Sequence, residues 1–249
     1  MHRYNLEFIS DQNLFDHVRA TVSKYRFNID LSKFNQNIID PIKLTFDAKI
    51  YNKTIAELID SETVRQIDKS NNNHIGYFHQ NIFNYIGDGW IVPKKGFDIV
   101  NEDKKIFVEM KNKHNTMNSS SAQKTYMRMQ SQVINDPEST CMLVEVIAKK
   151  SQNIIWKTRL DSESFSHEQI RRVSIDEFYK IVTGNKVAFK QLCEVLPTVI
   201  TDVVQTIKLH GIESSVLVEL KNISDNLLKS IYLFSFKKYE GFDSFDITG

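Results

Sequence analysis

Two acidic residues and a lysine lie close together in the middle of the chain: Asp98, Glu109 and Lys111. Alternate side chains of a strand share a face, so a strand over residues 106–111 points Glu109 and Lys111 the same way. A hairpin that returns from Asp98 brings its carboxylate opposite them. Two carboxylates suit a hard divalent cation, and a cation with an oriented water molecule hydrolyses phosphodiesters. We therefore expect Asp98 and Glu109 to hold a metal ion, and Lys111 to orient or help deprotonate the attacking water.

The spacing of Glu109 and Lys111 is common in this chain and does not identify a site by itself. An acidic residue precedes a lysine by two positions at Asp47/Lys49, Glu102/Lys104, Asp103/Lys105, Glu109/Lys111 and Glu219/Lys221. Glu219/Lys221 is the strongest competitor, but no Gly-x-Asp segment closely precedes it as Gly96-Phe97-Asp98 precedes Glu109. An ordinary amphipathic hairpin with a charged outer face remains the alternative.

A run of polar side chains directly follows the predicted strand. Residues 112–121 read NKHNTMNSSS, and asparagine and lysine side chains suit the base edges and phosphates of nucleic acid. Six lysines and arginines, but only one acidic residue, lie between Lys104 and Arg128. We expect nucleic-acid contacts from Lys113, His114, Asn115, Asn118, Ser119 and Ser120. The alternative is an ordinary solvated loop that ends in a helix cap.

The elements that position these residues follow from apolar periodicity. We expect short strands near residues 90–92, 97–100, 105–111, 141–148 and 154–158, with a turn at Asn101–Asp103 and a helix over about 123–134. Helices are expected over residues 11–24, 54–68, 74–87, 173–184 and 187–207, with a polar break at residues 71–73. Residues 216–221 and 231–236 suit either a strand or a buried helix. This order predicts an α/β protein with a mixed central sheet flanked by helices, and with helical N- and C-terminal regions.

The composition bounds the class of protein. The chain has 249 residues, 41% hydrophobic, with only 8 glycines and 4 prolines, which excludes collagen, low-complexity disorder and a disulfide scaffold. Without repeats or linkers, we expect a single domain of residues 1–249, with a helical region over 1–73, a core over 74–160 and a mainly helical region over 161–249. Cys141 and Cys193 lack metal-ligand spacing, so we expect both to be reduced core residues.

Several other classes of function have no support. No segment approaches the ~20 apolar residues of a membrane span, and the first fifteen residues lack the apolar run of a secretory signal, so we expect a cytoplasmic protein without membrane contact. No nucleotide-binding loop of the form GxxxxGK[ST] and no G-x-S-x-G serine motif occur. His74 and His79 are five positions apart, off a shared helical face, which disfavours a histidine metal site.

GFDIV followed by FVEMK resembles the core of the PD-(D/E)xK nucleases, with Phe97 in place of the usual proline. The strings VEMKNKHNTMNSSS, YFHQNIFNYIGDGW and RRVSIDEFYKIVTG resemble type II restriction endonucleases, and specifically the subgroup that cuts GGNCC. The resemblance implies a restriction-endonuclease-like fold in which Asp98 and Glu109 bind Mg²⁺ and Lys111 assists the attacking water. It also implies a second-shell or metal-water role for Gln80, near the place where many members carry a helical carboxylate.

The function that this resemblance implies is Mg²⁺-dependent, sequence-specific cleavage of double-stranded DNA at GGNCC, leaving 5′-phosphate ends. A homodimer is expected, because palindromic sites match two-fold protein symmetry. A cognate DNA methyltransferase is expected in the host. Two alternatives remain open: a non-catalytic DNA-binding protein on a nuclease-like scaffold, and a repair or RNA nuclease that acts on branched or single-stranded substrates.

Overall fold

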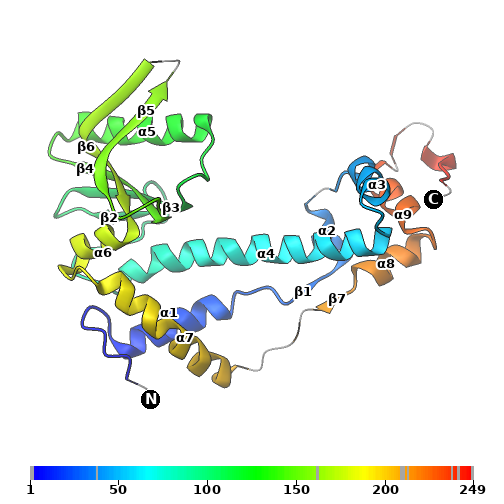
Figure 1. Cartoon of the computed structure of the whole chain (residues 1–249), viewed down its shortest axis with the longest axis horizontal. Helices are drawn as coiled ribbons and strands as arrows, with labels where there is room; N and C mark the ends of the chain where they lie inside the picture. Colours follow the sequence, from blue (N-terminus) through cyan, green and yellow to red (C-terminus); the bar gives the residue numbers. More distant parts are fainter. Residues whose placement is uncertain are drawn as a thin grey trace. The chain divides into compact units, whose positions relative to one another are not determined.

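A computed structural model describes residues 3–37, 39–160, 163–207, 211, 213–236, 238–239 and 242–247. Contacts divide the chain into two compact units (Figure 1). The first contains Met1–Ser23 and Ile75–Lys208, and the second contains Lys24–His74 and Leu209–Gly249. Each unit combines segments from both halves of the chain, unlike the three consecutive regions expected from the sequence. The single nuclease domain stays a prediction.

A mixed five-stranded sheet lies in the first unit, as the order of elements predicted. Its strands are β2 (Ile99–Asn101), β3 (Ile106–Lys113), β4 (Thr140–Ile147), β5 (Asn153–Leu160) and β6 (Glu163–Ser174). Their order is β2-β3-β4-β6-β5. The two outer pairs, β2 with β3 and β5 with β6, are antiparallel, and β4 is parallel to both of its neighbours. The expected strand at residues 90–92 is reduced to one bridge between Ile91 and Val100.

Helices cover both faces of this sheet (Figure 1). Strand alternation sends Val108 and Met110 into one core and Phe107 into another. The helix α5 (Ser119–Asn135) packs on the Phe107 side through Tyr126 and Met129. The opposite core is shared by the helices α1 (Asp11–Val22), α6 (Ile175–Thr183) and α7 (Ala188–Thr206) and by the end of α4 (Ile55–Asn81) with the short η1 (Ile82–Asn84). The hairpin that carries Glu109 is therefore buried between two layers.

Three local expectations are corrected. The helix α4 continues through Asn71 and Asn72, because Asn71 Oδ1 accepts the Arg26 N–H at 2.9 Å and Asn72 Nδ2 donates to Asp68 at 2.8 Å. No strand was predicted at β6, whose first residues are mostly polar and exposed. Cys141 is buried as expected, but Cys193 is exposed on α7.

The second unit is mainly helical within its described residues. Its elements are β1 (Asn28–Ile29), α2 (Leu31–Asn35), α3 (Pro41–Ile50), the first part of α4, β7 (Glu213–Ser214), α8 (Val216–Ile223), α9 (Leu227–Phe236) and η2 (Phe242–Ser244). The two ambiguous segments thus form the helices α8 and α9. Leu44, Ile59 and Leu220 belong to its core. The strands β1 and β7 form a short parallel pair.

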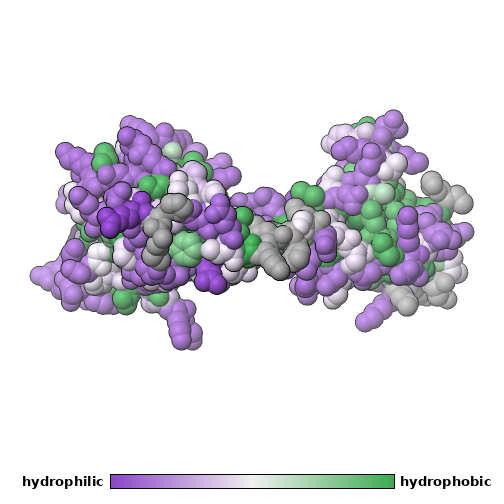
Figure 2. Space-filling view, turned by 90° about the horizontal axis from the view of Figure 1, so that it is seen from below, coloured by the Kyte–Doolittle hydropathy of each residue, from purple (hydrophilic) through white to green (hydrophobic). Residues whose placement is uncertain are grey.

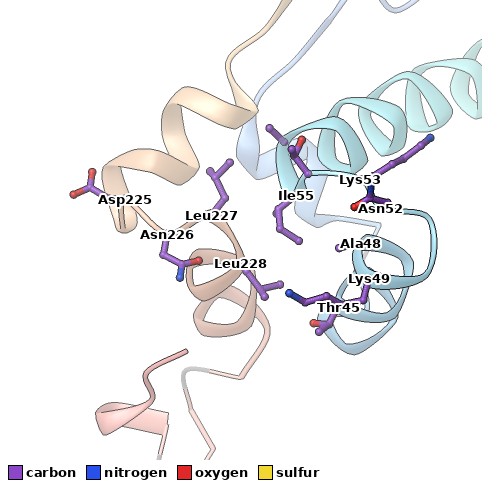
Figure 3. Close-up of a pocket in the computed structure, with 12 residues that line it drawn as sticks. Thr45, Ala48, Lys49, Asn52, Lys53, Ile55, Asp225, Asn226, Leu227 and Leu228 are labelled. Carbon is purple, nitrogen blue, oxygen red and sulfur yellow. The ribbon is translucent and has the colours of Figure 1, made fainter. Parts of the chain in front are cut away.

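A pocket of about 740 Å³ opens in this second unit. Ile55 lies on one wall, and Leu227 and Leu228 lie on the other (Figure 3). Its charged lining consists of Lys49, Lys53 and Asp225. The lining thus has one carboxylate and no histidine or cysteine, so it lacks the paired acids that metal-assisted hydrolysis requires.

No helix in the described ranges has the length and hydropathy needed to cross a bilayer. Hydrophilic residues cover most of the face seen in Figure 2, with hydrophobic residues in smaller groups.

Candidate active site

The β2–β3 hairpin brings Asp98 close to Glu109. The ladder ends at Ile99, which pairs with Val108, and the Asp98 N–H also donates to the Val108 carbonyl at 2.8 Å, so Asp98 and Ile99 both lie against Val108. The Asp98 side chain is anchored as well, since Oδ2 accepts the backbone N–H of Met110 at 2.8 Å. A carboxylate with one oxygen held by the backbone keeps its second oxygen available for another partner.

Glu109 and Lys111 lie on the same face of β3, as strand alternation predicted. Lys111 Nζ donates to Glu109 Oε1 at 2.7 Å. Glu109 is only 8% exposed, whereas the Lys111 side chain is 30% exposed. The carboxylate is thus almost buried, whereas part of the Lys111 side chain reaches solvent.

Arg128 also belongs to this cluster, although the sequence did not predict it as a site residue. It donates from Nη2 to Glu109 Oε2 and from Nη1 to the Gly96 carbonyl at 3.0 Å. Its guanidinium carbon lies 4.8 Å from the centroid of the Phe97 ring, a cation–π contact. The sequence held one signal for it, the basic stretch that ends at Arg128.

The charges of the cluster are closely balanced. Burial raises the pKa of Asp98, and the negative charge of Glu109 raises it further. The Met110 N–H, Lys111 and Arg128 act in the opposite direction on this pKa. A further positive charge beside Asp98 would favour its ionised form.

The donor set fits a hard divalent ion. Asp98 and Glu109 offer carboxylate oxygens, which Mg²⁺ prefers, and Mg²⁺ is commonly held by one or two carboxylates together with water and substrate phosphates. In the described ranges, no group of three or more His, Cys, Asp or Glu side chains is arranged to hold a metal. A site built on these two acids therefore needs ligands from water and substrate as well.

A second buried ion pair lies on the neighbouring strands. Glu145 on β4 is the register partner of Lys111 and is 1% exposed. Arg172 on β6 donates to Glu145 Oε1 from Nε at 3.0 Å and from Nη2 at 2.5 Å. The same Nη2 also donates to the His114 carbonyl at 3.2 Å. This pair therefore joins the sheet to the first residue after β3.

The polar segment after β3 forms an ordered turn. The His114 N–H donates to the Ile147 carbonyl at 3.1 Å, and Thr116 Oγ1 donates to the Lys113 carbonyl at 2.9 Å. Asn118 is the N-cap of α5, because its Oδ1 accepts the Ser121 N–H at 2.8 Å. Five of the six candidate contact residues are exposed and His114 is half-buried; the exposed ones are Lys113, Asn115, Asn118, Ser119 and Ser120.

Gln80 is half-buried near the end of α4. Among the described residues, it makes no hydrogen bond to Asp98, Glu109 or Lys111. One turn earlier, Gly76 faces Asn112, since a Cβ there would lie 3.5 Å from Asn112 Nδ2. The role of Gln80 near a metal stays a prediction.

A mixed sheet covered on both faces by helices, with paired acids and a lysine on its β2–β3 hairpin, defines a restriction-endonuclease-like core. Comparison with known proteins agrees. Residues 6–205 match the sequence profile of the Eco47II restriction endonuclease family. The chain is 35% identical over 214 residues to the type II restriction enzyme Sau96I of Staphylococcus aureus, covering 81% of this chain and 82% of that protein. It is 29% identical over 206 residues to the type II restriction enzyme Eco47II of Escherichia coli, covering 77% and 85%.

The chain therefore belongs to the Eco47II restriction endonuclease family. It is a type II restriction enzyme, a site-specific deoxyribonuclease that acts on double-stranded DNA. The family resemblance expected from the sequence is confirmed.

Proposed function

We propose that this enzyme makes Mg²⁺-dependent double-strand cuts at GGNCC and leaves 5′-phosphate ends. The observation that carries the metal-dependent chemistry is that the Asp98 carboxylate is held by the N–H of Met110, next to Glu109 on β3, while Lys111 is hydrogen-bonded to Glu109. The sequence GGNCC is supported by the resemblance of the segment from Val108 to Ser121 to the subgroup that cuts it.

Each active-site residue has a distinct role in this proposal. A bound Mg²⁺ ion supplies positive charge to the scissile phosphate and lowers the pKa of a water molecule. Asp98 and Glu109 hold the ion through carboxylate oxygens. Lys111 orients or helps to deprotonate the water molecule that attacks phosphorus in line with the 3′ oxygen. The bond from phosphorus to this oxygen breaks, which leaves a 5′-phosphate and a 3′-hydroxyl.

The polar turn after β3 supplies DNA contacts in this proposal. Asn115 and Asn118 read bases, Lys113 binds a phosphate or a guanine, and His114, Ser119 and Ser120 contact the backbone. The support is that these residues lie shortly after Lys111 along the chain, from the end of β3 to the start of α5, and that most of their side chains are exposed. The ion pair of Glu145 and Arg172 holds the turn at the His114 carbonyl.

The enzyme acts as a homodimer in this proposal, because one set of catalytic residues per chain cuts one strand and a palindromic site requires two. A cognate methyltransferase protects the DNA of the host. A cytoplasmic location, where such DNA lies, is part of the same proposal.

The test is cleavage of plasmid DNA by the purified protein, once with Mg²⁺ and once with EDTA, and by the variant Lys111→Ala with Mg²⁺. The ends of the fragments are then sequenced. We expect discrete Mg²⁺-dependent fragments that end within GGNCC, absent with Lys111→Ala. Lys221→Ala is the matched control, because Glu219 and Lys221 have the same spacing but lie on α8 in the second unit.

Three results would contradict parts of this proposal. Intact DNA in every buffer, with salt-sensitive binding retained, would indicate a DNA-binding protein on a nuclease scaffold. Cutting only of branched or single-stranded substrates would indicate a structure-specific nuclease. Fragments that share another end sequence would overturn GGNCC alone.

A further inference from the structure

Arg128 joins both halves of the active site. Its two hydrogen bonds go to the Glu109 carboxylate on β3 and to the Gly96 carbonyl, two residues before Asp98. Its guanidinium packs on the ring of Phe97, directly before Asp98. Phe97 thus provides a flat surface that the usual proline at this position would not offer.

Arg128 also occupies the oxygen of Glu109 that a metal ion needs. Lys111 is bonded to Oε1, and Arg128 is bonded to Oε2. The side chain of Arg128 is 40% exposed whereas that of Glu109 is 11% exposed, although Arg128 Nε itself is buried. A divalent ion that binds Glu109 therefore competes with a positive charge at the same place.

We propose that Arg128 is an exchangeable partner of Glu109. The divalent ion replaces Arg128 at Oε2 of Glu109, and the freed Nη2 of Arg128 then binds the scissile phosphate. This inference rests on the metal-dependent cleavage proposed above. The contacts with the Gly96 carbonyl and the Phe97 ring do not involve Glu109, so they hold the guanidinium beside the site after the exchange. An N–H of a guanidinium donates a charge-assisted hydrogen bond to a phosphate oxygen.

The first test measures metal binding without DNA. Mn²⁺, which also prefers carboxylate and water ligands, is titrated into the full-length protein, and free Mn²⁺ is counted by electron paramagnetic resonance. We expect Arg128→Gln to bind Mn²⁺ about tenfold more tightly than the wild type, because a competing charge is gone. Arg128→Lys retains the charge and should bind within about twofold of the wild type. Lys124→Gln, an exposed position one turn earlier on α5, is the matched control and should bind as the wild type does.

The second test measures cleavage at saturating Mg²⁺. We expect Arg128→Gln and Arg128→Lys to cleave at least about tenfold more slowly than the wild type, since neither side chain can donate to the Gly96 carbonyl and to the phosphate as a guanidinium does. If Arg128→Gln does not fold, Arg128→Lys decides: cleavage at the wild-type rate would overturn the phosphate role.

The outcomes separate this inference from the proposed function. If folded Arg128→Gln binds Mn²⁺ no more tightly than the wild type does, the exchange is overturned. If Asp98→Asn abolishes Mn²⁺ binding in the same assay, the proposed metal site still stands. Failure of the wild type to bind Mn²⁺ or to cleave with Mg²⁺ would overturn both.

Discussion

Lys111 donates a hydrogen bond from Nζ to Oε1 of Glu109 over 2.7 Å. The residue proposed to orient the attacking water is thus held by a residue proposed to bind the metal. The position of the ammonium group depends on Glu109, and the charge of Glu109 is partly balanced by Lys111. In the proposed mechanism the two side chains therefore act as one unit.

Residues that act as a unit should show non-additive losses of activity. We expect Glu109→Gln and Lys111→Ala each to lower the cleavage rate by at least about 10³-fold. The double variant should lose little more than either single variant. Single-turnover rates on a plasmid substrate measure this, and a double variant whose loss is the product of the two single losses would contradict it.

We expect the charge of Asp98 to lower the stability of the folded protein, although its proposed role in metal binding requires that charge. Its pKa is raised by burial and by Glu109, so the ionised side chain is disfavoured in the folded protein. Asp98→Asn removes the charge and keeps an oxygen for the Met110 N–H. Without added metal at pH 7, we expect a melting temperature equal to or above that of the wild type, while cleavage is abolished. A clearly lower melting temperature would show that the charge is stabilising.

Arg172→Met should destabilise the protein strongly, because it leaves the charge of Glu145 buried without its partner. Such losses cost roughly 3–5 kcal/mol. Arg171→Met is the control, since Arg171 lies next along β6 but makes exposed contacts with Asn153, and it should cost at most about 1 kcal/mol. Urea unfolding measures both, and equal midpoints would count against the pair.

His79 should make stability depend on pH. Burial, with a smaller contribution from His17, lowers its pKa to about 4. The unfolded value is about 6.5, so the unfolded chain binds more protons between these values and stability falls as pH drops from about 6.5 to about 4, by roughly 3 kcal/mol.

Unfolding of His79→Asn across this range checks the result, because the variant should lose that part of the slope. His167→Asn, at an exposed position, should keep it. A wild-type slope in His79→Asn would assign the dependence to other groups.

Asn118 has a structural role that is separable from its proposed DNA contact. Its side-chain oxygen caps α5, and Asn118→Asp keeps that oxygen while adding a negative charge beside the DNA. We expect an unchanged melting temperature and DNA binding weakened about tenfold, by electrostatic repulsion from phosphate. Asn118→Ala should instead cost about 1 kcal/mol of stability. Binding of Asn118→Asp at wild-type affinity, measured by fluorescence anisotropy in Ca²⁺, would argue against contact with DNA.

Local patterns correctly predicted the β2–β3 hairpin. Glu109 and Lys111 lie on one face of β3 because side chains alternate along a strand, and the polar residues after Asn101 predicted the turn. The helices α1, α6 and α7 follow from apolar periodicity in the same way. Local patterns were insufficient where a residue distant in the sequence decides the local structure. At Asn71, the side-chain oxygen accepts the backbone N–H of Arg26, which comes from another segment.

The sequence by itself determined the family and predicted the trio of Asp98, Glu109 and Lys111, because one hairpin and its flanking strings contain that information. Only the tertiary structure decided that Arg128 meets Glu109 and that Arg172 meets Glu145. These arginines come from α5 and β6, and their directions depend on how helix and strands pack against β3. A buried carboxylate needs a charged partner, but its own sequence neighbourhood does not specify which distant residue supplies it.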